Sequence, residues 1–195
     1  MTKPTDVSVI STIDDLREIN GSPSESTEAK KILKLEQHAR SIIDRSPFCL
    51  LATSSEEGTD VSPRGDAPGF VHCLDDTTLL IPERPGNRIA DSLRNIIANP
   101  NLGLLFLIPG MDDTLRINGK GYITNHEPYL SLLKAKDKTP KLAVIVDIEE
   151  VYLPCPKAFI RSSLWDPEQF MPRNELPTLG RMILEQINGE PPDAA

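Results

Sequence analysis

Short apolar segments of strand character follow one another through the middle of this chain. Their alternating or continuous hydrophobicity predicts strands at residues 48–53, 59–62, 70–74, 77–81, 102–108, 114–124 and 142–152. The connections, such as 54–58, 75–76 and 109–113, are short and carry Gly, Pro, Ser and Asp, which favour turns. Strands joined by short turns, with a helix inserted between two of them, fit a small closed antiparallel barrel better than an alternating βαβ sheet. We therefore expect a mainly β fold with flanking helices.

Helical patterns flank these strands. Apolar residues at helical spacing predict a short helix at 13–19, a longer one that Ser26 caps and that ends before Pro47, and others at 87–98, 127–136 and 176–187. A chain of 195 residues can bury one substantial core. We expect a single domain, with an N-terminal helical extension (1–46), a barrel (47–165), and a C-terminal helix and flexible tail (166–195) that pack on it.

Charge and hydropathy exclude several classes of protein. The chain has 29 acidic and 21 basic residues and a net charge of -8, so the basic footprint of a nucleic-acid-binding protein is missing. The longest apolar run, at 102–108, is too short to span a bilayer, and the polar N-terminus has no signal-peptide core. We expect a cytoplasmic protein without a nucleic-acid or membrane partner.

The cysteines and histidines show no catalytic or metal-binding spacing. Cys49, Cys73 and Cys155 form no close-spaced pair, and the histidines form neither an HExxH nor an HxH motif. The thiols are expected to be reduced and in the core, and no metal is expected. No Ser-His-Asp or Cys-His grouping or glycosidase-type carboxylate pair can be recognised, so hydrolytic catalysis is poorly supported.

A junction between a strand and a helix, at residues 79–92, is suited to holding an anion. The predicted helix start near Asn87 and Arg88 offers amides without intrahelical partners and the positive end of the helix dipole, and Arg88 adds a bidentate donor. These features favour a phosphate group. The alternative is an ordinary capped helix, because such N-termini are common.

Two further segments could line a site for a polar ligand. Residues 62–70 combine Arg64 and Asp66 with backbone groups exposed by Gly and Pro, although these two side chains could simply pair in a surface turn. Strand alternation places Thr114, Arg116 and Asn118 on one face, where they would line a wall of the site or face solvent.

The segment at residues 155–165 contains the single tryptophan of the chain, Trp165, beside Lys157 and Arg161. An aromatic ring next to cations suits a flat anionic ligand. Trp165 could equally anchor the core or an interface, with Arg161 in an ion pair.

In this order, these pieces resemble the pyridoxamine 5'-phosphate oxidase-like family of FMN-binding split barrels. The resemblance runs from about Phe48 to Trp165 and rests on the segments 49–53, 62–66, 81–82 with 86–88, and 115–119. The ending Lys-Ala-x-x-Arg-Ser-x-Leu-Trp, at 157–165, is similar to a branch of FMN-dependent proteins. The resemblance implies a split β-barrel and a homodimer with two FMN molecules in the subunit interface.

The resemblance also implies which residues bind the cofactor. Asn87 and Arg88 would hold the FMN phosphate, with Arg64 as a further contact. Ile81 and Pro82 would offer backbone groups to the ribityl chain or the ring edge. The remaining residues would approach the isoalloxazine or close the cleft, in part from the neighbouring subunit: Thr114, Arg116, Arg161 and Trp165.

The implied activity is FMN-dependent oxidoreduction of an unidentified small molecule, with no catalytic residue assigned. The true oxidase has an Arg-Lys pair at the helix start and a C-terminal Arg/His signature, whereas this chain has Arg88-Ile89 and an extra helix. Pyridoxamine phosphate oxidation is therefore not implied. Two alternatives stay open, namely a split barrel that binds haem or a deazaflavin, and a non-enzymatic dimeric binding module.

Overall fold

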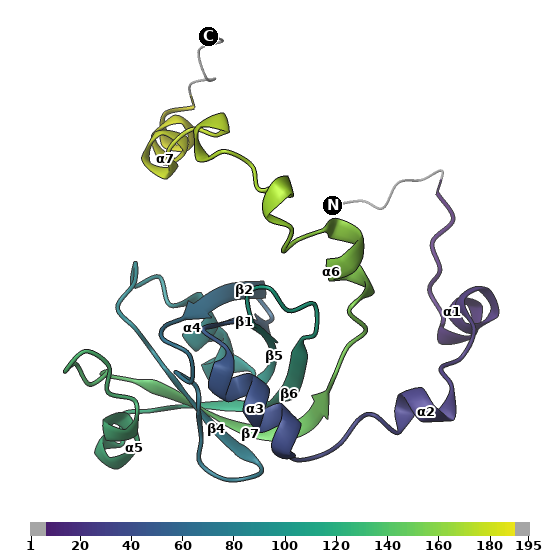
Figure 1. Cartoon of the computed structure of the whole chain (residues 1–195), viewed down its shortest axis with the longest axis horizontal. Helices are drawn as coiled ribbons and strands as arrows, with labels where there is room; N and C mark the ends of the chain where they lie inside the picture. Colours follow the sequence, from purple (N-terminus) through teal and green to yellow (C-terminus); the bar gives the residue numbers. More distant parts are fainter. Residues whose placement is uncertain (1–6, 190–195) are drawn as a thin grey trace.

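The computed structural model describes residues 7–189 and shows a curled β-sheet from which two helical arms extend (Figure 1). The strands are β1 (Phe48–Ser55), β2 (Gly58–Gly65), β3 (His72–Cys73), β4 (Thr78–Pro82), β5 (Asn101–Leu107), β6 (Leu115–Thr124) and β7 (Ala143–Tyr152). The α-helices are α1 (Ile13–Asn20), α2 (Glu25–Glu28), α3 (Gln37–Arg45), α4 (Asp91–Ala98), α5 (Glu127–Leu132), α6 (Lys157–Ser162) and α7 (Leu179–Asn188). The predicted mainly β fold with flanking helices is confirmed.

All strand pairs are antiparallel, in the order β2-β1-β5-β6-β7-β4-β3. The ladder begins at β2 and ends at β3, and no pairing joins these two strands in the described residues. The sheet is therefore split rather than closed by hydrogen bonds, which corrects the prediction of a closed barrel. The helix α4 lies in the chain between β4 and β5, strands that do not pair with each other.

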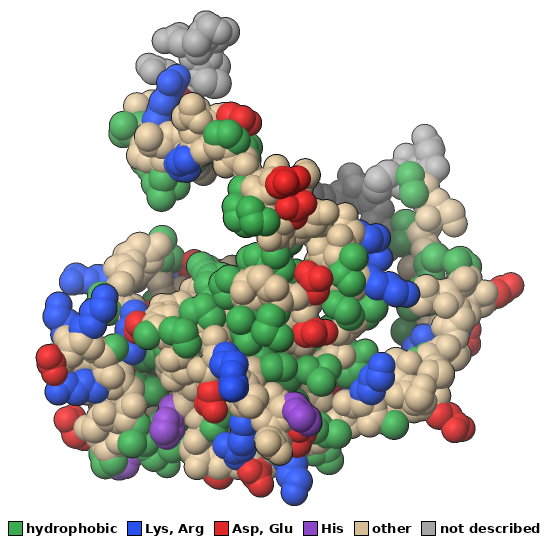
Figure 2. Space-filling view, viewed as in Figure 1, with side chains coloured by type: hydrophobic (Ala, Val, Ile, Leu, Met, Phe, Trp, Pro, Cys, Tyr) green, Lys and Arg blue, Asp and Glu red, His purple; other side chains and the backbone are tan. Residues whose placement is uncertain are grey.

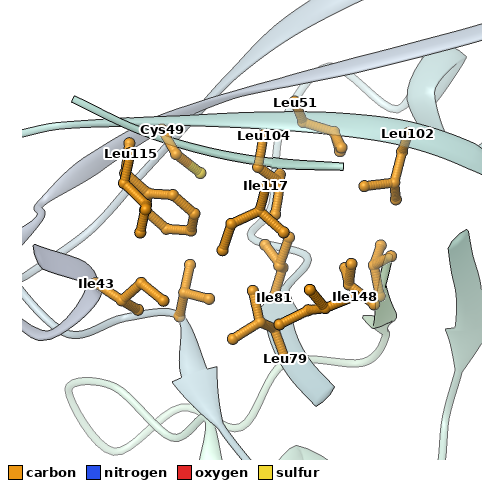
Figure 3. Packing of buried hydrophobic residues seen from close by; sticks show 14 of the residues in the cluster. Ile43, Cys49, Leu51, Leu79, Ile81, Leu102, Leu104, Leu115, Ile117 and Ile148 are labelled. Atoms are coloured by element: carbon orange, nitrogen blue, oxygen red, sulfur yellow. The ribbon is translucent and has the colours of Figure 1, made fainter. Parts of the chain in front are cut away.

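The core lies inside the curl of the sheet, and α3 and α4 cover its openings. Alternate residues of the central strands point inward and are fully or almost fully buried, as Figure 3 shows for Leu51, Leu104 and Ile117. From α3 the side chain of Ile43 enters this cluster, and α4 contributes Leu93 and Ile96. Because β1 and β5 bury one face here, their side chains of opposite parity lie on the outside of the sheet.

The longest strand pair, β6 with β7, contains a β-bulge. The register shifts between Asn118 and Gly119, which face Glu150 and Ile148, so Glu149 has no partner of its own. At Gly119 the backbone of β7 approaches so closely that a Cβ atom would lie 2.1 Å from the carbonyl oxygen of Asp147. This glycine is required by the close approach of the two strands.

Several predicted boundaries are wrong, and two of these errors lie before residue 70. The helix expected from Ser26 to before Pro47 is two helices, α2 and α3, because Ile32 between them exchanges backbone hydrogen bonds of 3.0 and 2.7 Å with Val151. In addition, pairing in β2 continues through Pro63 to Gly65, whereas the predicted strand ends at residue 62. Pro63 is tolerated because β2 is an edge strand.

The two arms end the described chain. The predicted short helix at the start is confirmed as α1, and the predicted C-terminal helix as α7. None of the residues of α7 is buried, and Figure 1 places it apart from the barrel, whereas we expected it to pack there. Of the flexible tail predicted from Gly189, residues 190–195 lie outside the described residues, as do residues 1–6 of the N-terminal tail.

Candidate functional site

A cleft of about 380 Å³ lies at the free edge of the sheet, between β2, the end of β4 and the start of α4. Three of the predicted cofactor-binding residues line it: Arg64, Pro82 and Asn87. Ser62 and Ser92 line it as well. The structure thus brings together residues that are up to 30 positions apart in the sequence.

The helix at this cleft begins later than predicted. Its first residue is Asp91, not Asn87, because Arg88 and Ala90 adopt left-handed backbone conformations with φ of 66° and 61°. The Asn87 side-chain oxygen accepts a hydrogen bond of 3.0 Å from the Ile89 amide. No side chain caps the helix at Ala90, and the first two helical residues, Asp91 and Ser92, line the cleft.

Two ion pairs cross between the end of β2 and the segment after β4. Nη1 of Arg64 donates to Glu83, and Nε of Arg84 donates to Asp66 at 2.7 Å. The pair between Arg64 and Asp66 that we considered is therefore not formed. The Ala67 amide and the Arg84 guanidinium lower the pKa of Asp66 below its usual value.

One donor of Arg64 has no partner. The side chain is only 15% exposed, and its Nε is buried without a hydrogen bond to the described protein atoms. A buried guanidinium N–H without an acceptor is costly. An oxyanion in the cleft could supply that acceptor, so the residues fit a phosphate group.

A polar network that we did not predict lies under the cleft. The hydroxyls of Ser62 and Ser92 both donate to one carboxylate oxygen of Asp60 at 2.7 Å, and Ser92 is buried. The sequence could have indicated part of this network, because Asp60 and Ser62 alternate with Arg64 along β2 and therefore share one face of the strand. Their connection to Ser92 requires the tertiary fold.

Three other predicted cofactor-binding residues are not among those that line the cleft. Ile81 is buried in the core beside Pro82, and Arg88 is exposed next to the cleft but not among its lining residues. Thr114 is buried and borders a different cavity, of about 470 Å³, between α3 and the β5–β6 connection. These residues are not brought to one point within a single chain.

Arg116 lies on the outside of the sheet. It contacts Glu150 at 3.3 Å and stands 4.8 Å over the Tyr152 ring. The register places it three strands from Pro63 at the cleft, through Leu50 and Leu105, which is about 14 Å at the usual strand spacing. Arg116 and Arg64 of one chain therefore do not reach the same group.

Trp165 and Arg161 belong to the C-terminal arm. The indole Nε1 donates to the Met111 carbonyl at 2.8 Å, and the ring stacks against Phe159 with centroids 6.3 Å apart. Arg161 is exposed on α6. Neither residue lies among those that line the cleft of its own chain.

The three thiols differ sharply in their surroundings. Burial raises the pKa of Cys49 to about 12 and that of Cys73 to about 11, whereas Cys155 is exposed, contrary to the prediction that all three lie in the core.

Because the thiolate is the reactive form of cysteine, we expect iodoacetamide at pH ~8 to alkylate native Cys155 at least ~100-fold faster than Cys49. Peptide mass spectrometry over time would measure this, and early modification of Cys49 would contradict the packing around it.

Within residues 7–189, no group of three or more His, Cys, Asp or Glu side chains is arranged to hold a metal ion. Over the same residues, none of the helices has the length and apolar character needed to cross a membrane.

Two solved structures share this fold at low sequence identity. HupZ of Group A Streptococcus, as a single-residue variant, has a TM-score of 0.51 at 18% identity, covering 61% of this chain and 98% of HupZ. A second HupZ structure has a TM-score of 0.50 at 18% identity, covering 61% and 93% of the two chains. A candidate pyridoxamine 5'-phosphate oxidase of Lactobacillus delbrueckii has a TM-score of 0.49 at 22% identity, covering 63% and 98%. No curated protein matches the sequence.

The sequence model of the family described as pyridoxamine 5'-phosphate oxidase matches residues 35–155, which is more than half of the chain. The matched range contains every strand of the sheet together with α3, α4 and α5. The split-barrel prediction is confirmed, and the chain belongs to the pyridoxamine 5'-phosphate oxidase family.

Proposed function

We propose that this protein is an FMN-dependent oxidoreductase that binds the FMN phosphate in the cleft between β2 and α4. The observation that carries this proposal is the unpartnered buried Nε of Arg64 beside the uncapped start of α4. A guanidinium and free helix amides together are a strong site for a dianionic phosphate. The bound flavin would supply the acceptor for a hydride or for electrons.

Residues in and beside the cleft would bind different parts of FMN. Arg64 in the cleft and Arg88 beside it would provide positive charge, and the left-handed backbone conformations of Arg88 and Ala90 would fix the amides next to them. Ile81 and Pro82 offer backbone groups to the ribityl chain or ring edge. Because Pro82 ends a buried strand, this wall of the cleft is rigid.

A second copy of the chain would complete the site. Arg116, about 14 Å from Pro63 of its own chain, is too far to share one ligand group with Arg64. We place Thr114, Arg116, Arg161 and Trp165 at the cofactor of the partner in a homodimer. A cation such as Arg116 near the pyrimidine end of the ring would stabilise negative charge on reduced flavin. The substrate is a small molecule, and the cytoplasm is the expected compartment.

The test is a titration of the purified protein with FMN and, separately, with riboflavin, which lacks the phosphate. We expect flavin absorption bands and quenched flavin fluorescence with FMN, and about 100-fold weaker binding of riboflavin, because the phosphate contacts are charge-assisted. Equal affinity for both ligands would place the phosphate outside the cleft. A protein that ignores FMN but shows a Soret band or binds a deazaflavin would replace this proposal with the alternative cofactor.

A further inference from the structure

The C-terminal arm, residues 156–189, carries an apolar helix face that no other part of the described chain covers. Helix α7 presents Leu179, Met182, Ile183 and Ile187 at helical spacing, and all four are exposed. The arm begins just beyond the family domain, which ends at residue 155. Helices this short gain their stability from packing their apolar face, so α7 needs a docking surface.

The exposed area has the size of an interface. A compact monomer of 21.5 kDa exposes roughly 9,200 Å², whereas this chain exposes 13824 Å². The excess of several thousand Å² is comparable to what obligate homodimers bury. Most of the large hydrophobic residues that are exposed lie in the arms and not in the barrel.

Prolines hold the arm away from its own barrel. They recur between β7 and α7, at Pro154, Pro156, Pro167, Pro172 and Pro177. Proline fixes φ and favours extended, stiff connections. Figure 2 shows an open gap between the end of the arm and the barrel, so the apolar face of α7 is presented to another molecule.

The barrel has an apolar surface on the side of the sheet away from the core, which we call the outer face. It consists of outward residues of β2, β1 and β5, namely Val61, Pro63, Phe48, Leu50, Ala52, Leu105 and Leu107. Antiparallel sheets that face water normally carry polar residues on that side. Figure 2 shows hydrophobic side chains gathered on the barrel surface below the C-terminal arm.

The dimensions of the helix and the outer face agree. Three strands span about 10 Å from first to last, and five residues of a strand about 17 Å. A helix of ten residues is about 15 Å long and about 10 Å across. We propose that α7 of each copy docks on the outer face of a second copy, so that the two C-terminal arms clasp the homodimer. This clasp rests on the second copy in the proposed function, but it requires no flavin.

Sedimentation equilibrium of the full chain tests the clasp. Wild type is expected at twice 21.5 kDa, and Ile183→Asp/Ile187→Asp should raise the dissociation constant about 100-fold or more, because charges enter an apolar contact. The control Arg181→Gln/Asn188→Asp changes net charge equally but leaves the apolar face intact, and it should stay dimeric. Ile183→Ala/Ile187→Ala, which retains helix propensity, should show a smaller shift in the same direction.

A double-mutant cycle tests the docking position. Ile187→Ala and Val61→Ala should each weaken the dimer, and their combined effect should depart from the product of the two by about 2-fold or more if the residues touch. Any of four results would overturn the clasp. The wild type could be monomeric, the aspartate variant could remain as dimeric as wild type, or the charge control could shift equally. The fourth is that the effects of Ile187→Ala and Val61→Ala simply multiply. A dimer that persists without the arm contact would still allow the flavin proposal, which the FMN titration tests separately.

Discussion

Arg64→Gln is expected to weaken FMN binding about 100-fold to 1,000-fold while the protein remains folded. The substitution removes the buried Nε that has no partner and the positive charge beside the helix start. One charge-assisted hydrogen bond to phosphate contributes about 1.5–3 kcal/mol, and the lost positive charge adds to this, for a total of about 3–4 kcal/mol. Fluorescence titration of FMN would give the affinity, and near-UV circular dichroism would check the fold.

Two matched variants make this result specific to the cleft. Arg94→Gln removes the same charge from α4, but Arg94 is 62% exposed, does not line the cleft and pairs mainly with Glu57 at 3.1 Å and more loosely with Asp91 at 3.7 Å, so FMN affinity should change little. Glu83→Gln removes the carboxylate that competes for Arg64 and should leave affinity equal or higher. If Arg64→Gln and Arg94→Gln weaken binding equally, the phosphate lies elsewhere.

Gly119→Ala is expected to lower the free energy of unfolding by about 3 kcal/mol or more. Its Cβ would lie 2.1 Å from the backbone oxygen of Asp147, and neither strand can yield without breaking the β6–β7 ladder. For a chain of this length, the melting temperature should fall by roughly 6–12 °C. Thermal unfolding followed by far-UV circular dichroism measures this shift.

Gly86→Ala is the matching control for stability. No atom lies within 4 Å of the Cβ position at Gly86, and its φ is outside the left-handed region, so the melting temperature should stay the same or rise slightly. A Gly119→Ala protein as stable as this control would mean that β6 and β7 do not approach each other as closely as the structure shows.

The strands could be predicted from the sequence because the turn residues that end them are local signals. Turn residues mark the ends of β1, β4 and β5, and the alternation of Leu115, Arg116 and Ile117 gives the correct inner and outer faces of β6. The break between α2 and α3 could not be predicted, because it depends on Ile32 pairing with a strand more than a hundred residues away. Tertiary hydrogen bonds leave no periodic signal.

The candidate site could be predicted only in part. Arg64, Pro82 and Asn87 meet in one cleft, in keeping with the shared ligand that the family resemblance implied for them. The start of α4 was misplaced because Arg88 and Ala90 adopt left-handed conformations that Gly usually marks, and neither residue is Gly. Arg116 and Trp165 lie away from this cleft in their own chain, so their predicted role depends on a second copy and stays a prediction.

The crossed ion pairs also protect the sheet. Strand β2 is a free edge, and such edges invite pairing with strands of other molecules and hence aggregation. The segment that carries Glu83 and Arg84 is tied to this edge by its two ion pairs, and Ser92 ties α4 to it through Asp60. Because the side chains of both pairs are only 15–26% exposed, salt screens these pairs weakly, and this cover of the edge persists at high ionic strength.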